Sequence, residues 1–291
     1  MPTQNNKTGS AAEFNANWEN RKESLYNHWC ADKPQNQIQF AFARHWDVFS
    51  ELMRRAEPGT SLEVGCGRGS ISSHFAEHGW DVTLLDHSQS VLDISRQIFA
   101  HNGHKATFLV GDANALPFLD RQFDAVVSIG LLEHFENVER PLEEQWRVLR
   151  PGGWLLAYIV PERPDNLQKW FNWLNTVLRL VVPPVLTKQD RPEQKEPIFR
   201  NDYTSAAYVP VLERLGAKAP FVSGMYSMPM VSHSPEFPFS LLPAPLEKVL
   251  VAIFFCAVKL RSLLMGRHGW LCSERAGQAF LVAAQKEPCE Y

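Results

Sequence analysis

Several patterns that would assign a sequence to a class at once are missing from this one. Its five cysteines are odd in number and form no CxxC pair, so reduced thiols in a cytoplasmic protein are the simplest account. The 29 basic and 32 acidic residues give a net charge of -3 without any Lys/Arg-rich run, which argues against a nucleic acid as partner. The polar N-terminus, MPTQNNKTGSAAEFNANWEN, has no apolar core and predicts no signal peptide.

The sequence does contain a distinctive glycine turn at Leu62–Ser70, LEVGCGRGS. A short apolar run passes an acidic residue, Glu63, and opens into glycines at the alternate positions 65, 67 and 69. Because glycine lacks a Cβ atom, this spacing lets the chain leave a strand in a sharp turn and bring its backbone close to a ligand. We therefore expect a small cofactor over the turn. The GxGxxG turn of dinucleotide-binding folds is similar, but here the third glycine comes one residue early.

Carboxylates follow the next two predicted strands. Asp81–Asp86 is an apolar strand whose last residue lies 17 positions after Gly69. A carboxylate there can accept hydrogen bonds from both ribose hydroxyls of an adenosine, although an Asp in this position can equally cap a helix. Phe108–Phe118 places Asp112 directly after a strand, within reach of an adenine amino group. These two segments favour an adenosine-containing cofactor.

Two further segments complete the pattern. Phe123–Phe135 is a buried strand that runs into Gly130 and a short helix, and Trp154–Val160 is a fifth strand that follows an LRPGG turn. In order and spacing, the five segments resemble the class I S-adenosylmethionine (SAM)-dependent methyltransferases over Ser61–Val160, and most closely their small-molecule, UbiE-like or type 11 branch.

The resemblance implies an α/β fold with a Rossmann-like seven-stranded sheet. The sheet would be mostly parallel with an antiparallel last strand and helices on both faces, together with an N-terminal helical lid and helical insertions. It also implies S-adenosyl-L-methionine as cofactor, S-adenosyl-L-homocysteine as product and no metal.

Carried over by position, the resemblance assigns eleven residues to the cofactor. Glu63, Gly65, Cys66 and Gly67 would line the methionine end, Asp86 and His87 the ribose, Asp112 and Ala113 the adenine, and Ser128, Ile129 and Gly130 the pocket beneath the sulfonium. Cys66 is interpreted as a small filler of the turn and not as a nucleophile.

The 291 residues leave room for substrate-binding additions but hardly for a second full domain. We expect the following division: 1–13, a disordered tail; 14–58, the helical lid; 59–161, the SAM-binding core; 162–202, a helical insertion; 203–224, a core helix and strand six; 225–275, an apolar substrate or roof insertion; and 276–291, the last core strand and C-terminus. Within 203–224, the helix is expected over Tyr203–Leu215 and strand six over Lys218–Ser223.

Two apolar segments lie outside the predicted core. Asn166–Leu186 places Trp170 and its neighbours on a broad helical face, and Leu246–Met265 contains an uncharged run that is shorter than the ~20 residues of a membrane-spanning helix. Residues 246–265 would pack on the Trp170 segment to roof a hydrophobic acceptor pocket, or lie in a membrane interface with basic flanks. We favour the roof. Peripheral contact with the inner membrane surface is compatible with it for a lipid-like acceptor.

Methyl transfer from a sulfonium is an in-line displacement at carbon, so the main task of an enzyme is to hold donor and acceptor aligned in a dry site. An oxygen or nitrogen acceptor also needs a base nearby. His134, just after the fourth strand, is the first candidate, and His233, Tyr203 and His28 are further ones. Each of them has an alternative role in packing, in pocket lining or at a helix start.

Three functions are compatible with these observations. A SAM-dependent methyltransferase acting on a hydrophobic small-molecule or lipid-like acceptor accounts for all five segments. The alternative is an NAD(P)-dependent oxidoreductase on a Rossmann core, against which the early third glycine and Gly111-Asp112 count. A membrane-associated, non-catalytic scaffold would keep the fold and use Leu246–Met265 for association. The sequence leaves open which atom would be methylated, as well as the oligomeric state.

Overall fold

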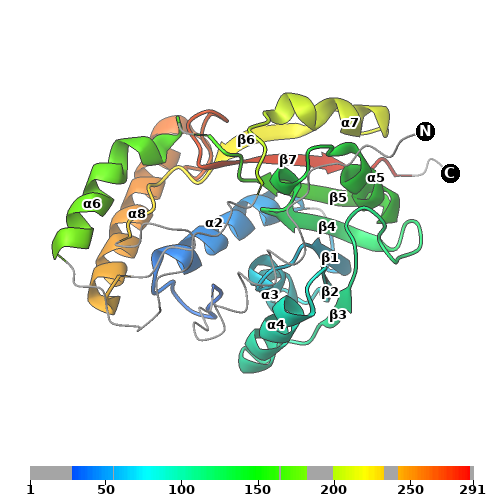
Figure 1. Ribbon diagram of the computed structural model, residues 1–291, viewed down its shortest axis with the longest axis horizontal. Coiled ribbons are helices and arrows are strands. Elements are labelled where there is room, and N and C mark those ends of the chain that lie inside the picture. The colour runs from blue at the N-terminus through cyan, green and yellow to red at the C-terminus, as the bar shows by residue number, and fades with distance from the viewer. Residues whose placement is uncertain (1–27, 55, 164, 182–198, 233–241, 289–291) are drawn as a thin grey trace.

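The computed structural model describes residues 28–54, 56–163, 165–181, 199–232 and 242–288 (Figure 1). The predicted tail 1–13 and the first part of the predicted lid lie outside the described residues. His233 lies outside them too.

The core is a seven-stranded sheet with the order β3-β2-β1-β4-β5-β7-β6 (Figure 1). Pairing is parallel from β3 through β5, whereas β7 is antiparallel to both β5 and β6. The predicted fold class is therefore confirmed. The strands are β1 (Thr60–Val64), β2 (Asp81–Asp86), β3 (Thr107–Val110), β4 (Phe123–Ile129), β5 (Leu149–Ile159), β6 (Phe221–Met225) and β7 (Ala279–Gln285).

Helices cover both faces of this sheet because successive strand residues point to opposite sides. On β5, Leu156 and Tyr158 join one core cluster, while Leu155 and Ala157 join the other. The first cluster is covered by α2 (Gln37–Leu52), α3 (Ser70–Glu77), α4 (Gln89–His101) and α8 (Ala244–Met265), and the second by α5 (Glu139–Val148) and α7 (Val209–Arg214). The remaining helices are α6 (Asn172–Val181) and the 3-10 turns η1 (Leu132–His134), η2 (Leu167–Phe171) and η3 (Ser205–Ala207).

Prolines move two boundaries away from their predicted places. The helix expected over Tyr203–Leu215 is divided into η3 and α7, and α7 has Pro210 in its first turn, where a missing N–H group costs nothing. The strand expected over Lys218–Ser223 begins only at Phe221. Ala219 adopts a left-handed φ of 45°, and Pro220 has no N–H group to give to a sheet.

A buried hydrogen-bond network joins α8 to the start of α2. Glu247 accepts from the backbone and side-chain N–H groups of Gln37 at 2.9 and 3.0 Å, and from the backbone N–H of Leu242 at 2.9 Å. Gln37 in turn donates to the carbonyl of Val231 at 2.6 Å. A carboxylate at a helix N-terminus is favoured by the partial positive charge there. Glu247 therefore fixes α8 against α2.

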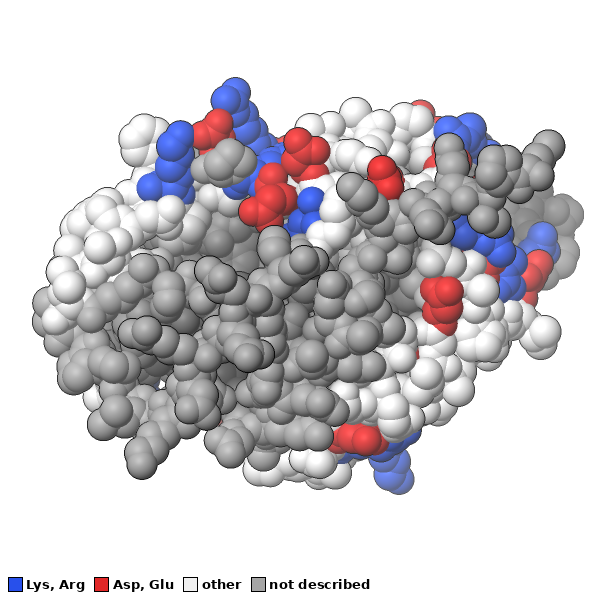
Figure 2. Space-filling view, in the orientation of Figure 1, with Lys and Arg blue, Asp and Glu red and all other residues white. Residues whose placement is uncertain are grey.

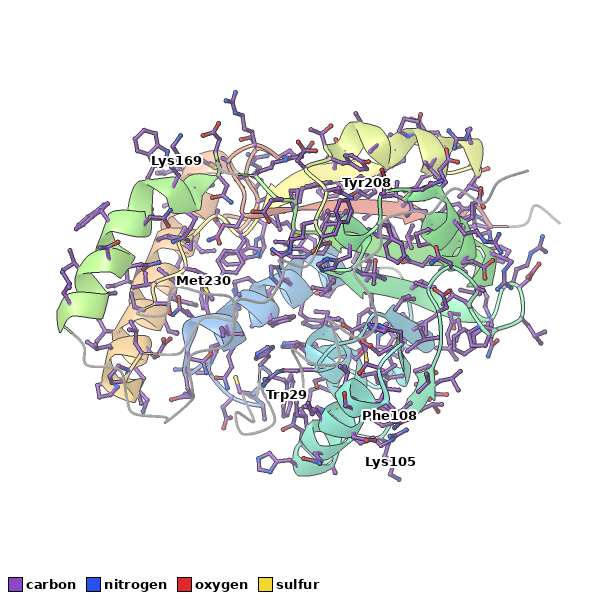
Figure 3. All side chains as sticks on the ribbon, in the orientation of Figure 1. Trp29, Lys105, Phe108, Lys169, Tyr208 and Met230 are labelled. Carbon is purple, nitrogen blue, oxygen red and sulfur yellow. The ribbon has the colours of Figure 1, made fainter. Side chains whose placement is uncertain are left out.

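The segment before residue 233 also holds α6. Asn175 on α6 and Gln168 on η2 both donate to the carbonyl of Met230, at 3.1 and 3.0 Å. Figure 3 shows Met230 between α2 and α6, and Figure 1 shows α6 and α8 at the same end of the molecule. Among the described residues, no helix combines the length and apolar character needed to cross a bilayer.

Candidate functional site

The candidate site lies at the carboxyl ends of β1, β2 and β4 (Figure 1). Strand order reverses at β1, because β2 and β3 lie on one side of it and β4 on the other. Open α/β sheets bind ligands in the crevice at such a reversal. Glu63 on β1 pairs in register with Leu84 on one side and Val127 on the other. The glycine turn, Asp86 and Gly130 consequently leave the sheet at the same edge.

The glycine turn is closed by its own backbone. Gly65, Gly67 and Gly69 have φ values of 69°, 52° and 66°, in the left-handed region that favours glycine. The N–H groups of Gly65 and Cys66 donate to the carbonyl of Leu85 at 2.9 and 3.0 Å, and that of Gly69 donates to the carbonyl of Cys66 at 2.8 Å. These hydrogen bonds hold the turn against the end of β2, and the three N–H groups that make them are not free to bind a ligand.

Close packing adds a second reason for glycine at two of these positions. A Cβ atom at Gly65 would lie 2.7 Å from Leu131 Cδ1. At Gly69 it would lie 2.5 Å from Leu84 Cδ2 and 2.7 Å from Phe99 Cε2. No side chain fits at either place without moving these residues.

The Asp86 carboxylate is oriented by hydrogen bonds to both of its oxygens. Oδ2 accepts from the N–H of Gly67 at 3.2 Å, and Oδ1 accepts from the N–H of Ser88 at 3.0 Å. His87 Nδ1 lies 3.3 Å from Oδ1, and its hydrogen bond with Asp86 raises the pKa of His87. Each carboxylate oxygen has two lone pairs, so this group can still accept hydrogen bonds from a ligand.

Glu63 lies at the start of α3. Its Oε2 accepts from the backbone N–H of Ser72 at 3.2 Å. An N-cap side chain normally accepts from this N–H group, but the N-cap residue of α3 is Gly69, which has no side chain. Burial raises the pKa of Glu63 to about 8, against the opposing effect of this hydrogen bond. A carboxyl group from β1 therefore caps α3.

The β3 exit lies beside the β2 exit. The N–H of Gly111 donates to the carbonyl of Asp86 at 3.0 Å. Asp112 is exposed, and its Oδ1 accepts from the backbone and side-chain N–H groups of Asn114 at 2.9 and 3.0 Å. Ala113 is buried directly after it. Asp112 and Ala113 thus follow Asp86 along the same edge.

The β4 exit contains buried polar atoms without partners. Gly130 has a left-handed φ of 65° and donates its N–H to the carbonyl of Tyr158 at 2.9 Å. Ser128 Oγ and both carboxyl oxygens of Glu133 have no hydrogen-bond partner of normal geometry among the described residues. A Cβ atom at Gly130 would lie 3.4 Å from Glu133 Oε1. Buried polar atoms are nearly always satisfied, so these point to a ligand.

Glu133 is the residue that sequence reasoning missed. Its side chain is 1 % exposed, and burial raises its pKa to about 7. The available signal was an acidic residue in the short helix directly after the fourth strand, next to His134. Nothing in the local sequence shows whether such a carboxyl group faces solvent or the interior.

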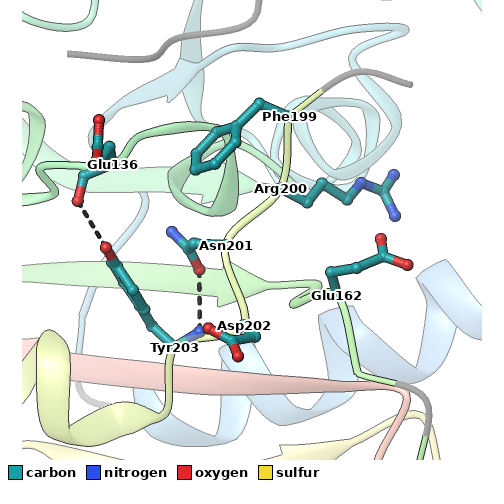
Figure 4. Close-up of a pocket in the computed structure, with 7 residues that line it drawn as sticks. All are labelled: Glu136, Glu162, Phe199, Arg200, Asn201, Asp202 and Tyr203. Atoms are coloured by element: carbon teal, nitrogen blue, oxygen red, sulfur yellow. Dashed lines mark hydrogen bonds between the residues drawn. The ribbon is translucent and has the colours of Figure 1, made fainter. Parts of the chain in front are cut away.

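A pocket of about 430 Å3 opens next to η1 (Figure 4). It is lined by Glu136, Glu162 and residues 199–203. Asn201 ties this wall to η1, since its N–H donates to the carbonyl of Glu133 at 2.7 Å and its side chain to that of Phe135 at 2.9 Å. The segment from 199 therefore closes over the helix that carries Glu133.

The structure places His134 and Tyr203 beside this pocket. His134 Nδ1 lies 2.7 Å from the carbonyl of Phe199 and is the donor in that pair, and burial lowers the pKa of His134 to about 4. The Tyr203 hydroxyl donates to the carbonyl of Glu136 at 3.0 Å. Both polar groups are thus engaged with main-chain carbonyls.

His28 lies instead at the glycine turn. Its Nδ1 is 2.7 Å from Ser70 Oγ at the start of α3, and its ring stacks on Phe42 with 5.3 Å between the ring centroids. Burial, with a smaller effect of the Arg68 charge, lowers the pKa of His28 to about 3. The fourth candidate base, His233, cannot be placed because it lies outside the described residues.

Comparison with known proteins agrees with this geometry. Residues 62–157 match the family model of the methyltransferase domain. The chain is 32% identical over 200 residues to a demethylmenaquinone methyltransferase of Leptospira interrogans, which covers 64% of this chain and 73% of that enzyme. It is 33% identical over 158 residues to a demethylmenaquinone methyltransferase of Listeria monocytogenes. That alignment covers 52% of this chain and 65%, just under two thirds, of the Listeria enzyme.

Solved structures share the fold over nearly the whole chain. A SAM-dependent methyltransferase of Thermotoga maritima, described as a possible histamine N-methyltransferase, has a TM-score of 0.55 at 15% identity and covers 96% of this chain and all of that one. The [4+2]-cyclase SpnF also has a TM-score of 0.55, at 19% identity, and covers 97% and 95%. The sequence relatives show that the chain belongs to the class I SAM-dependent methyltransferases, in the UbiE-like branch.

Proposed function

We propose that this protein transfers a methyl group from SAM to a hydrophobic, quinone-like acceptor. The observation that carries the proposal is a set of polar atoms beside Gly130 that have no hydrogen-bond partner of normal geometry among the described residues, namely Ser128 Oγ and the Glu133 carboxyl oxygens. When bound, SAM supplies an activated methyl group on a positively charged sulfur. Buried carboxyl oxygens without partners suit a cationic ligand, because the ligand's charge compensates their desolvation.

The other cofactor contacts follow from the geometry of the edge. Asp86, held by Gly67 and Ser88, would take the ribose hydroxyls with His87 beside it. Asp112 and Ala113 would flank the adenine. The turn from Glu63 to Gly67 would receive the methionine end, and Ser128, Ile129 and Gly130 would close the pocket beneath the sulfur.

A dinucleotide fits this turn less well than SAM does. A pyrophosphate needs free backbone N–H groups and a positive helix N-terminus. Here the N–H groups of Gly65, Cys66 and Gly69 are used within the turn. Glu63 occupies the start of α3. With these groups already occupied, the NAD(P)-dependent alternative is disfavoured.

The acceptor would lie beyond the β5 and β6 exits. Tyr158 and Tyr226 extend from these strands into an aromatic cluster with Trp270 and His45, with centroid separations of 4.5 to 6.0 Å. Demethylmenaquinone, the substrate in the relatives' names, is of this apolar aromatic type. In this proposal 59–161 form the cofactor core and the insertions 162–202 and 225–275 shape the acceptor site. The enzyme would work at the cytoplasmic membrane surface.

For the base, the geometry of the described residues favours Glu133 over His134, Tyr203 and His28. His134 is a weak base because burial lowers its pKa to about 4, and the hydroxyl of Tyr203 already donates to a carbonyl. The Glu133 carboxyl group has no hydrogen-bond partner of normal geometry among the described residues, and its pKa of about 7 suits proton transfer near neutral pH. We propose that Glu133 accepts the proton of an acceptor hydroxyl, with His134 and Tyr203 shaping the pocket.

Cofactor binding tests the proposal directly. Calorimetry with S-adenosyl-L-homocysteine should show binding to the wild type and a loss of at least about tenfold in affinity for Asp86→Ala. The matched control is Asp81→Ala, at the exposed start of the same strand, which should bind as the wild type does. Absence of affinity in the wild type would refute the proposal. Transfer of labelled methyl from SAM to a demethylated quinol in detergent would then test the acceptor.

A further inference from the structure

Large exposed apolar side chains are concentrated on two helices at one end of the molecule. Twelve of the fifteen found among the described residues lie on η2, α6 or α8. Figure 1 shows α6 and α8 together at this end, and Figure 2 shows mainly uncharged residues among the described side chains on the outer side over α6. Isolated exposed apolar residues need no explanation, but a contiguous group of this kind marks an interaction surface.

The two faces of α8 are both apolar, and only one of them is covered. Phe254 and Val258 face the core, and Phe254 packs on Phe40 of α2 with 6.1 Å between the ring centroids. On the opposite side Ile253 is 55 % and Leu260 is 56 % exposed. A helix that is apolar all round is normally covered on every side or in contact with lipid. The outer face of α8 therefore has no covering partner in the described part of the chain.

The exposed charges of α8 are all basic. Lys248 and Lys259 are exposed and lie eleven residues apart, about three helical turns, so they share one edge of the apolar face. The acidic residue of this helix, Glu247, is buried at the start of α2. Arg267 is exposed just after the C-cap Gly266. This arrangement is complementary to anionic lipid headgroups, because long basic side chains can extend from an apolar face to the interface.

The second part of this apolar surface is η2–α6, which exposes two tryptophans. Trp170 and Trp173 are 74 % and 64 % exposed, and Val177 and Leu180 continue the same stripe along α6. Leu174 and Leu178, on another side of the helix, pack against the core. Tryptophan prefers the boundary between headgroups and acyl chains, where its ring is apolar and its N–H is hydrated.

We propose that η2–α6 and α8 form a docking surface for an anionic lipid bilayer, in which their apolar side chains enter the interface and Lys248, Lys259 and Arg267 contact the headgroups. The surface extends the membrane contact expected for 246–265 to a second helix. It would bring the insertions of the proposed acceptor site to a lipophilic substrate. Docking requires no methyl transfer, so it stands or fails independently of the proposed chemistry.

The full chain would be mixed with vesicles of phosphatidylglycerol and phosphatidylethanolamine, or of phosphatidylcholine alone, and sedimented. Binding to the anionic vesicles, weakened by high salt, is expected. Trp170→Ser combined with Trp173→Ser, and separately Lys248→Glu combined with Lys259→Glu, should each lower partitioning by at least about tenfold. Leu119→Ser, which removes an 80 % exposed leucine from the β3–β4 connection, should not. Asp86→Ala should bind vesicles as the wild type does.

Circular dichroism would establish that each variant is folded, and the charge-reversal pair keeps the test valid if the tryptophan pair does not fold. Failure of the wild type to bind anionic vesicles would overturn the proposal. Equal loss in Leu119→Ser would overturn it as well. A dimer in sedimentation velocity that the tryptophan substitutions convert to a monomer, without vesicle binding, would assign the surface to a second copy of the chain instead.

Discussion

At the scale of single residues, the carboxyl groups of Glu63 and Glu133 share burial but differ in their surroundings. Glu63 caps α3 through Ser72, whereas Glu133 has no partner of normal geometry in the described part of the chain. A group with a raised pKa and free valences can exchange a proton with a ligand, while a capping group is committed to the fold. The second therefore suits catalysis better.

Glu133→Gln should lower kcat by about 100-fold or more, because the amide cannot accept the proton, and it should raise KM for SAM, because the amide carries no charge to compensate the sulfonium. In the wild type, log kcat/KM should rise with pH until about 7 and then level off, following ionisation of Glu133 in the free enzyme. That rise should be absent from the variant. Steady-state rates across pH would show this, with the exposed Glu139→Gln as control. An unchanged pH profile in Glu133→Gln would exclude Glu133 as the base.

Gly69 and Gly103 allow steric and conformational effects to be separated. Both have left-handed φ values, 66° and 73°, but a Cβ atom at Gly103 would meet nothing within 4 Å. Gly103→Ala should cost about 1 kcal/mol of unfolding free energy, from strain alone. Gly69→Ala should cost about 2 kcal/mol more, because the methyl group meets Leu84 and Phe99. Urea unfolding would measure both, and equal costs would contradict the packing argument.

At the scale of elements, α8 depends on one buried carboxylate. Glu247 connects residues that are 210 positions apart in the chain. Glu247→Ala should lower the unfolding free energy by about 2 to 4 kcal/mol, because Gln37 and Leu242 would keep buried N–H groups without acceptors. Glu51→Ala, at the exposed end of α2, should change it by less than about 0.5 kcal/mol. Thermal or urea unfolding would compare them, and similar values would contradict this role of Glu247.

Element boundaries show which local signals decide structure. The glycine turn and the ends of the first two predicted strands fall where the sequence places them, because strand alternation and glycine spacing act over a few residues. The predicted helix 203–215 and strand 218–223 were wrong in extent. Their prolines remove N–H groups at positions where a continuous helix or an earlier strand would need them.

At the scale of the whole molecule, buried titratable groups set the pH range of stability. Burial lowers the pKa of four histidines from an ordinary 6.5, to about 3 for His28, His45 and His74 and about 4 for His134. The unfolded chain then binds more protons than the folded one below pH 6.5. Stability from these groups is therefore present above the ordinary pKa and is lost as pH falls.

Glu63 and Glu133 act in the opposite direction. Their pKa values are raised from 4.5 to about 8 and about 7, so their contribution is complete below 4.5 and declines as pH rises to those values. Together with the histidines, they place the maximum melting temperature at about pH 6 to 7. Glu63→Gln should move this maximum to higher pH, and Glu51→Gln should not. Thermal melts from pH 5 to 9 would test it, and a maximum that stays in place would contradict the raised pKa.

By itself, the sequence determined the order of the strands along the chain and the polar residues at their carboxyl ends. Glu63, Asp86, Asp112 and Gly130 could be read from it because a strand, its exit and the next turn are local. Only the tertiary structure decided which of these groups are buried, which amides are already satisfied and which helix faces are exposed. Each depends on segments far apart in the chain: Glu133 is enclosed by residues near Asn201, while the apolar stripe of α6 turns its tryptophans outward.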